Sequence, residues 1–320
     1  MKLIIQIPCL NEAEALPLTL RDLPRSVPGF SQVEWLVIND GSTDGTVDVA
    51  RKWKVDHIVS FARNRGLASA FMAGLDACIK LGADVIVNTD ADNQYSAADI
   101  PALVKPILDQ KADIVIGARP INDIQSFSPL KKMLQKLGSS VVRLVSRTEI
   151  PDAPSGFRAM TREAAMRLNV FNHYTYTLEM IIQAGQKNIA VMSVPVGVNA
   201  PLRASRLVKS VGSYVVRSII TIARIFVVYK LFRFFMTIGL TLVVLGGLLG
   251  LRYLSYYFAG QGSGHVQSLI LASILLGGGF QTMLVAFVAD LLAVNRRLME
   301  DIQFRTKVME CRNHDDPAPR

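Results

Sequence analysis

The chain has 320 residues, half of them apolar, and a formal net charge of +9. A chain of this length and apolar content can bury the core of a full α/β domain and still has residues left over. The cysteines Cys9, Cys78 and Cys311 are far apart and lack Cys-x-x-Cys or Cys/His spacing, so neither a disulfide framework nor a zinc site is indicated, and a reduced cytosolic environment is expected. The charge predicts an anionic partner, which is nucleic acid, an anionic membrane or a phosphate-bearing substrate.

The chain begins with an apolar stretch, residues 3–7, that turns polar at once. This stretch is too short for the apolar core of a signal peptide, so we expect a first strand and a catalytic part that stays in the cytoplasm. The exit loop runs from Pro8 to Asn11, and a helix is predicted to begin near Glu12.

Residues 34–38 predict a second strand, and a polar loop, NDGSTDG, follows it. Gly41 permits a tight turn there, and the residues after it can cap a helix that begins near Thr46. Asp40 lies at the carboxyl end of the strand, where it can accept hydrogen bonds from a base or a ribose. The residues alone leave open that the loop provides only turn and cap chemistry.

A third strand is expected over residues 58–62, and Arg65 and Gly66 then open a helix of small residues over 67–74. A basic residue and a glycine at a helix N-terminus favour anion binding. An ordinary helix start with an exposed Arg65 explains the same pattern, and the sequence does not decide between the two.

The most informative stretch is VIVNTDADNQY, residues 85–95. It begins as an apolar strand buried on both faces and turns polar where such strands leave a parallel sheet, the edge at which these sheets bind ligands. Asp90 and Asp92 flank Ala91, and Gln94 follows closely. These hard oxygen ligands suit Mg²⁺ or Mn²⁺ carrying a diphosphate. An ordinary solvated turn is the alternative that the triplet alone leaves open.

Strands alternate with helices as far as Arg119, which predicts a parallel, doubly wound α/β sheet. Ser96 is expected to cap a helix that ends at Leu108. A strand over 113–117 then runs into Arg119, which places a cation at a strand's carboxyl end.

The next segment is a basic helix over residues 130–147, in which Lys132 and Lys136 share one face. A solvated face is the default interpretation of these lysines. A turn-rich loop over 152–158 follows. The last expected elements of this domain are helices from about Thr161 and Thr175 and a strand over 190–198.

In this order and spacing, the motifs resemble the family 2 glycosyltransferases, inverting enzymes of GT-A fold that use nucleotide-diphospho-sugars. They resemble most closely the polyprenyl-phosphate, dolichol-phosphate mannose synthase-like branch. The resemblance spans about residues 1–209 and is carried by IPCLNEAE, VINDGSTDGT, RNRGLASAFMAGL, NTDADNQY, DIVIGAR, DAPSGFRAMTREA and LRASRLVKS. It implies a GT-A type nucleotide-diphospho-sugar-binding domain.

The resemblance also implies a set of site residues. A divalent cation, Mg²⁺ or Mn²⁺, is expected at Asp90, Asp92 and Gln94. The donor nucleotide-sugar is expected at Pro8, Asn11, Glu12, Asp40, Arg65, Gly66, Asp90 and Ala91. The phosphate of the acceptor is expected at Arg119, Lys132, Lys136, Arg203 and Arg206. Catalytic roles are expected for Asp92, Arg119 and Asp152.

The C-terminal part of the chain contains two uncharged apolar runs, residues 234–251 and 266–289. Each is long enough to cross a bilayer of roughly 30 Å at about 1.5 Å per residue. Basic residues lie on both outer flanks, so the positive-inside rule places both ends in the cytoplasm and the glycine-rich loop outside. Three cations spaced along residues 210–233 predict helices lying on the membrane surface. Two buried helices of a soluble domain are the alternative.

These patterns divide the chain into four parts: a glycosyltransferase domain (1–209), juxtamembrane amphipathic helices (210–233), a transmembrane hairpin (234–295) and a cytoplasmic tail (296–320).

The expected chemistry depends on the acceptor. A metal at Asp92 would neutralise the diphosphate leaving group as Lewis acid and template. A lipid phosphate, with a second pKa of about 6, is largely ionised at neutral pH and requires cations instead of a strong base. A hydroxyl acceptor would require a carboxylate base, for which Asp152 is the first candidate. The alternative that Asp152 is only a loop residue, hydrogen-bonded to the nearby backbone, stays open.

The sequence therefore predicts an integral membrane enzyme that transfers a sugar from a nucleotide-diphospho-sugar to a polyprenyl phosphate at the cytoplasmic leaflet. A hydroxyl acceptor and a non-catalytic nucleotide-sugar-binding membrane protein are the alternatives. A processive polysaccharide synthase is disfavoured because Trp35 and Trp53 precede Asp90, so no Q-x-x-R-W motif follows it. No nucleic-acid motif accompanies the basic residues. The sugar, the base, the lipid and a homo-oligomer stay open.

Overall fold

A computed structural model describes residues 1–120, 150–170, 176–200, 211–260 and 262–315, with the backbone alone for 211–230, 262, 263 and 312–315. The predicted basic helix over 130–147, Lys132, Lys136, Arg203 and Arg206 lie outside the described residues. The chain divides into two compact units, residues 1–222 with 303–320, and residues 223–302. Each unit is described by itself below, and the domain boundaries expected from the sequence stay predictions.

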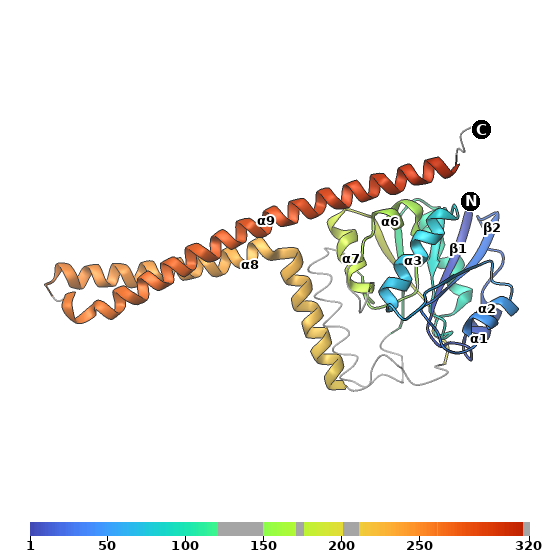
Figure 1. The fold of residues 1–320 in the computed structure, drawn as a ribbon, viewed down its shortest axis with the longest axis horizontal. Helices are drawn as coiled ribbons and strands as arrows, with labels where there is room; N and C mark the ends of the chain where they lie inside the picture. The colour runs from blue at the N-terminus through green and yellow to red at the C-terminus, as the bar shows by residue number, and fades with distance from the viewer. Residues whose placement is uncertain (121–149, 171–175, 201–210, 261, 316–320) are drawn as a thin grey trace. The chain divides into compact units, whose positions relative to one another are not determined.

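The first unit alternates strands and helices along the chain (Figure 1). Its elements are β1 (Lys2–Cys9), α1 (Leu16–Asp22), β2 (Gln32–Asn39), α2 (Thr46–Lys52), β3 (His57–Ser60), α3 (Leu67–Lys80), β4 (Val85–Asn88), the 3-10 helix η1 (Ala97–Asp99), α4 (Ile100–Leu108), β5 (Ile114–Ala118), β6 (Arg158–Thr161), α6 (Arg162–Arg167), α7 (Thr177–Gln186) and β7 (Val191–Pro195).

The strands form one seven-stranded sheet in the order β3-β2-β1-β4-β6-β5-β7. All pairs are parallel except those of β6, which runs antiparallel to both β4 and β5. The α/β class is confirmed, but the sequence reading placed residue 158 in a loop and missed β6. A four-residue strand is too short to show a hydrophobic period, and the antiparallel strand makes the sheet mixed.

Two helix starts also differ from the prediction. α1 begins at Leu16 because the segment after Glu12 first forms a turn, in which the Glu12 carbonyl accepts hydrogen bonds from the backbone N–H groups of Ala15 and Leu16. The helix predicted to start at Ser96 begins as a 3-10 turn, and the Ser96 side chain makes no cap hydrogen bond.

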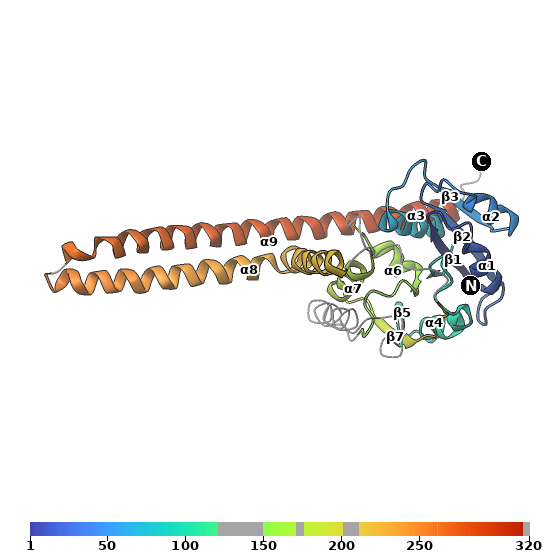
Figure 2. The same cartoon turned by 90° about the horizontal axis from the view of Figure 1, so that it is seen from below.

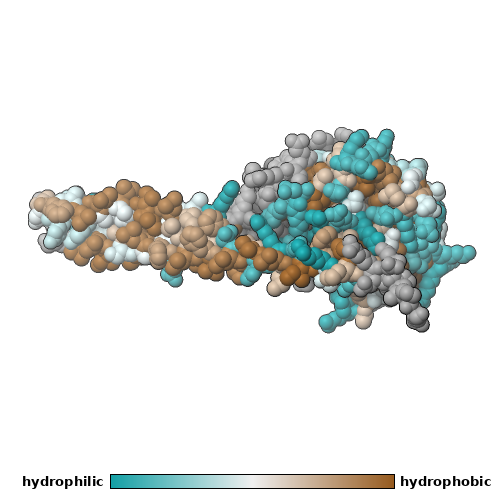
Figure 3. Space-filling model, turned by 90° about the horizontal axis from the view of Figure 1, so that it is seen from above, coloured by the Kyte–Doolittle hydropathy of each residue, from teal (hydrophilic) through white to brown (hydrophobic). Residues whose placement is uncertain are grey.

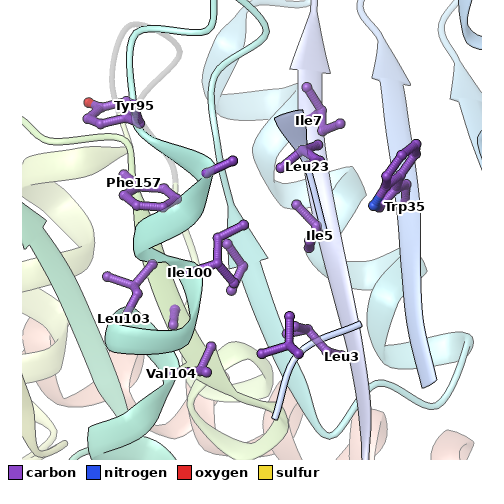
Figure 4. Packing of buried hydrophobic residues seen from close by; sticks show 14 of the residues in the cluster. Leu3, Ile5, Ile7, Leu23, Trp35, Tyr95, Ile100, Leu103, Val104 and Phe157 are labelled. Atoms are coloured by element: carbon purple, nitrogen blue, oxygen red, sulfur yellow. The ribbon is translucent and has the colours of Figure 1, made fainter. Parts of the chain in front are cut away.

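β1 is buried on both faces, as the central strand of a doubly covered sheet should be. Leu3, Ile5 and Ile7 point into the core cluster that includes side chains of α1 and α4 (Figure 4). The alternate residue Gln6 faces the other side, where an added Cβ on Gly74 of α3 would come 2.3 Å from the Gln6 Oε1. Glycine at position 74 therefore lets α3 pack closely on the sheet. Figure 2 shows α3, α6 and α7 on one side of the sheet and α1 and α4 on the other.

Two long helices, α8 (Val211–Phe258) and α9 (Val266–Asp315), are joined by the 3-10 turn η2 (Gly262–His265), and the second unit consists of residues 223–302 of this pair. Both helices are long and apolar enough to cross a membrane, over Leu231–Phe258 and Val266–Cys311. Their large apolar side chains point outward, as for Leu248, Phe280 and Leu291, and brown, hydrophobic atoms cover the surface of the hairpin (Figure 3). The backbone of residues 211–233 belongs to α8, and the expected juxtamembrane amphipathic helices stay a prediction.

The two helices of the hairpin approach closely at glycines. An added Cβ on Gly239 would lie 2.6 Å from Cγ of Met283 and 2.9 Å from the carbonyl oxygen of Gly279. An added Cβ on Gly246 would lie 3.0 Å from the backbone nitrogen of Leu276. Small residues that let backbones approach are typical of helix pairs in lipid, where packing replaces the hydrophobic effect.

Candidate functional site

The loops that leave the carboxyl ends of β1 and β2 are tied to each other. The Asn11 Oδ1 accepts a hydrogen bond of 2.8 Å from the Thr43 N–H, and the Asn11 N–H donates to the Ser42 Oγ at 2.9 Å. The Glu12 N–H donates to the Thr46 Oγ1 at 2.9 Å. The hydroxyls and amides of the second loop therefore fix the first loop, which holds predicted donor-site residues.

Asp40 reaches from the second loop to the third. Its carboxylate is almost fully buried and accepts hydrogen bonds from the backbone N–H groups of Arg65 at 2.7 Å and Gly66 at 3.0 Å, at the start of α3. An added Cβ on Gly41, whose φ is +72°, would meet the carbonyl carbon of Arg63 at 2.4 Å. Only glycine allows the two loops to pass this closely, and the structure thereby brings Asp40, Arg65 and Gly66 together.

The local cap chemistry of the second loop is carried by Asp44. Its carboxylate accepts hydrogen bonds from the N–H and hydroxyl groups of Thr46 and, at 3.1 Å, from the Ala13 N–H. Burial opposes these bonds, and the net result is a pKa of Asp44 below its ordinary value. Asp44 therefore provides the turn and cap chemistry of this loop, while Asp40 joins it to the next loop. A role of Asp40 towards a base or a ribose stays a prediction.

Asp90 and Asp92 follow β4 in a turn that is fixed from two sides. The Ala91 carbonyl accepts a 2.8 Å hydrogen bond from the Thr19 hydroxyl of α1. The Gln94 N–H donates to the Asp92 Oδ1 at 3.1 Å. Burial and the neighbouring charge of Asp92 raise the pKa of Asp90 from 3.8 to about 7, against the opposing charges of Arg119 and Arg158.

These carboxylates suit a divalent cation that is completed by its substrate. Within the described residues no group of three His, Cys, Asp or Glu side chains could hold a metal alone. Mg²⁺ is commonly bound by one or two carboxylates together with substrate phosphates. Burial, together with the charge of Asp92, makes the ionised form of Asp90 unfavourable, and a cation bound beside the two carboxylates would favour it. Asp90 and Asp92, with Gln94 as a predicted third ligand, therefore fit Mg²⁺ or Mn²⁺ that also binds a diphosphate.

A buried polar layer lies beneath Asp90. The Asn88 Oδ1 accepts from the Gln6 Nε2 at 2.9 Å, and the Asn88 Nδ2 donates to the Gly156 carbonyl at 2.8 Å and the Tyr176 hydroxyl at 2.9 Å. The Gly156 N–H donates to the Tyr95 hydroxyl at 2.9 Å. The sequence reasoning missed these residues. The only signal was that Asn88 ends an otherwise apolar strand.

Gly156 lies against the turn after β4 that contains Asp90 and Asp92. An added Cβ on Gly156 would lie 2.9 Å from the Asp90 Oδ2. The loop before β6 therefore closes directly over Asp90, and a side chain at position 156 would push into the carboxylate.

Arg119 and Asp152 form a buried ion pair. The Arg119 Nε donates to the Asp152 Oδ2 at 2.7 Å, the Nη2 to the Oδ1 at 3.0 Å, and the Arg119 backbone N–H to the Oδ2 at 3.2 Å. Burial lowers the pKa of Arg119, but the nearby Tyr95 and Asp152 outweigh it and leave this pKa above its ordinary value. Arg119 is thus held as a fixed cation, and both oxygens of Asp152 are occupied by its donors.

The structure therefore brings most of the described candidate residues to the carboxyl edge of the sheet, while their assigned roles stay predictions. They lie at the end of β1, in the loops after β1, β2, β4 and β5, or just before α3, and they are Pro8, Asn11, Glu12, Asp40, Arg65, Gly66, Asp90, Ala91, Asp92, Gln94 and Arg119.

The sequence is similar to those of known proteins. The model of the family described as glycosyl transferase family 2 matches residues 4–168. The undecaprenyl-phosphate mannosyltransferase of Micrococcus luteus is 28% identical over 206 residues, which cover 61% of this chain and 83% of that protein. The polyprenol monophosphomannose synthase of Mycolicibacterium smegmatis is 28% identical over 204 residues, which cover 60% of this chain and 76% of that protein.

Solved structures of lower identity share the fold. The glucosyl-3-phosphoglycerate synthase of Mycobacterium tuberculosis, in complex with Mn²⁺, UDP and phosphoglyceric acid, has a TM-score of 0.55 at 19% identity, covering 69% of this chain and 78% of that chain. The same protein in complex with Mg²⁺ and UDP has a TM-score of 0.52 at 18% identity, covering 69% and 79%.

Proposed function

Because this chain belongs to glycosyl transferase family 2 and has the GT-A fold, it is a glycosyltransferase, and we propose that it transfers a sugar from a nucleotide-diphospho-sugar to a polyprenyl phosphate. The proposed reaction depends on a divalent cation, inverts the anomeric centre and takes place at the cytoplasmic leaflet. The names of the relatives from Micrococcus luteus and Mycolicibacterium smegmatis support a polyprenyl acceptor.

The Arg119–Asp152 pair is the observation that favours a phosphate over a hydroxyl acceptor. A hydroxyl acceptor requires a base, but Asp152, the sequence's first candidate, has both oxygens bonded to the Arg119 side chain. A phosphate acceptor is already ionised near neutral pH and is attracted by a fixed cation. The pair therefore supports a phosphate nucleophile, with Asp152 orienting Arg119.

The donor side uses groups that the fold already holds in place. Asp40 and the start of α3 would bind the nucleotide, and Asp90, Asp92 and Gln94 would hold the cation beside the diphosphate. When bound, the cation supplies positive charge to the diphosphate leaving group. The loop at Gly156, packed on Asp90, would exclude water from that side of the carboxylate.

The two apolar helices support a membrane location. α8 and α9 are candidate spans, and an enzyme anchored in this way meets a lipid acceptor at the headgroup level. Arg233 precedes the first apolar run, and Arg296 and Arg297 follow the second. By the positive-inside rule we place both flanks in the cytoplasm, where nucleotide-sugars would be supplied.

The proposal is tested by transfer of labelled sugar from a panel of UDP- and GDP-sugars, with Mn²⁺ or Mg²⁺ and the purified full chain in lipid. The acceptors are a polyprenyl phosphate and the matching polyprenol, which differ only in the phosphate. We expect product with the phosphate alone, formed with inversion of the anomeric configuration as measured by NMR.

Two variants at acidic positions complete this experiment. Asp92→Asn should lower the rate by about 100-fold or more, since loss of metal-based charge stabilisation costs several kcal/mol. Asp109→Asn, in an exposed ion pair with Lys111, should leave the rate unchanged. Product with the polyprenol alone would overturn the phosphate acceptor, and metal-dependent nucleotide binding without any product would indicate a binding protein.

A further inference from the structure

Arg158, the first residue of β6, is fully buried and bonded to backbone. Its Nε donates to the Ser155 carbonyl at 2.7 Å, its Nη2 to the Ala153 carbonyl at 2.7 Å, and its Nη1 to the Thr177 carbonyl at 2.9 Å. One guanidinium thus joins two points of the loop before β6 to the start of α7.

Burying the Arg158 guanidinium costs free energy, which suggests that the position of the loop it holds is important. Removing a guanidinium from water carries a penalty that neutral carbonyl acceptors compensate less well than a carboxylate does. An apolar side chain would avoid that penalty, but it would leave the three carbonyls without these donors. The three bonds of Arg158 instead fix the backbone at residues 153, 155 and 177, which a hydrophobic contact would not do.

The loop that Arg158 holds contacts Arg119, proposed to bind the acceptor phosphate, at one end. At its other end it contacts Asp90, proposed to bind the cation of the donor. At its start, Asp152 accepts both side-chain hydrogen bonds of Arg119. At its end, Gly156 packs on Asp90 and exchanges hydrogen bonds with Asn88 and Tyr95. A shift of this loop would therefore move Arg119 relative to Asp90.

We propose that Arg158 is a positioning residue for the transfer step, which fixes the 152–156 loop so that Asp152 aims Arg119 at the acceptor phosphate beside the donor diphosphate. This inference rests on the function proposed above. Arg158 acts through the loop and does not touch the substrates. Lysine cannot replace it, because its single ammonium lacks the planar fork that reaches three separate carbonyls.

A double-mutant cycle on the full chain in lipid tests this inference, with transfer to polyprenyl phosphate as the readout. The variants are Arg158→Lys, Asp152→Asn and the double variant. Arg158→Met is added as an apolar replacement, and thermal melting of each variant checks folding. The control is Arg167→Lys, which alters a half-buried arginine that is paired with Glu163 and keeps the positive charge at this position.

We expect Arg158→Lys to lower kcat by about 10- to 100-fold, as misplacement by about 1 Å does in other active sites. The KM for the nucleotide-sugar should stay within about threefold of wild type, because Arg158 makes none of the bonds that hold Asp40. In the Arg158→Lys background, Asp152→Asn should cost less than about a third of its effect in the wild type, since residues acting as one unit are non-additive. Arg167→Lys should match wild type.

Several results would overturn the inference. If the kcat effects of Arg158→Lys and Asp152→Asn are additive, or if kcat and the nucleotide KM deteriorate together with the melting temperature, Arg158 has only a structural role. If Arg158→Met matches wild type in kcat, the fork is unnecessary. If wild type itself forms no product with polyprenyl phosphate, the proposed function fails first, and this inference fails with it.

Discussion

The first unit, which carries the candidate site, and the apolar hairpin of α8 and α9 hold their secondary-structure elements in place by different interactions. Beneath Asp90, the side chains of Gln6, Asn88 and Tyr176 are buried and joined by directed hydrogen bonds. In the hairpin, α8 and α9 meet where Gly239 and Gly279 remove the side chains between two backbones. The first arrangement sets positions through the angles of polar bonds and the second through contact distance, and each fails under a different kind of substitution.

Asn88→Leu should produce the largest loss of stability, because it removes the centre of the polar layer. The Gln6 amide, the Gly156 carbonyl and the Tyr176 hydroxyl would each lose a buried partner. The Tyr176 hydroxyl keeps its 3.5 Å hydrogen bond to the Gly156 carbonyl, so these two groups retain a partner. Since an unsatisfied buried group costs about 1–3 kcal/mol, we expect a total loss of roughly 3 kcal/mol in the free energy of unfolding, measured by denaturant titration.

Tyr176→Phe is the graded control for that substitution. It removes one partner of Asn88 and keeps the ring that stacks on Phe71 at 3.8 Å between centroids. A loss of about 1 kcal/mol is expected. Equal losses in the two variants would show that the layer is held by packing and not by its hydrogen bonds.

The stability of the hairpin should depend instead on the size of the side chains between its two helices. Gly239→Leu would drive a side chain into Met283 and the backbone of Gly279, and overpacking of this kind costs about 1–3 kcal/mol. Gly247→Leu is the matched control on the same helix, because nothing lies within 4 Å of its added Cβ. Thermal melting in detergent should show a lower transition for the first variant alone, and equal transitions would contradict the close packing.

The sequence predicted the parts of the site that follow strands, and it failed where a contact joins distant segments. Asp40, Asp90 and Arg119 each end an apolar run, so their place at one sheet edge follows from the parallel topology. Arg158 and Tyr176 come from β6 and the start of α7 and meet under the site. Nothing local in their neighbourhoods indicates a long-range bond, which is why the polar layer and β6 were both missed.

Asp90→Asn should stabilise the metal-free protein at alkaline pH by about 1–2 kcal/mol, while it removes transfer activity. Between pH 4 and 7 the folded state keeps a proton on Asp90 that the unfolded state has released, since the pKa is raised from 3.8 to about 7. The stability of wild type should therefore rise as pH falls from 8 towards 4. Melting curves with chelator should show a flatter pH dependence for Asp90→Asn, and identical profiles would contradict the raised pKa.

The smallest effect is expected inside the first unit, between its C-terminal segment, residues 303–315, and the helices α3 and α6. Lys307 pairs with Asp76 of α3 at 2.8 Å, and Arg167 lies over the Phe304 ring at 4.7 Å. The Asp76 side chain is 46% exposed, so solvent screens the pair and a coupling of about 0.5 kcal/mol is expected in a double-mutant cycle with Asp76→Asn and Lys307→Met. This coupling should fall in 1 M salt, where screening acts over about 3 Å, whereas the cost of Phe304→Ala should persist. A salt-independent coupling above about 2 kcal/mol would instead place this contact with the buried polar layer, as a fixed part of the first unit.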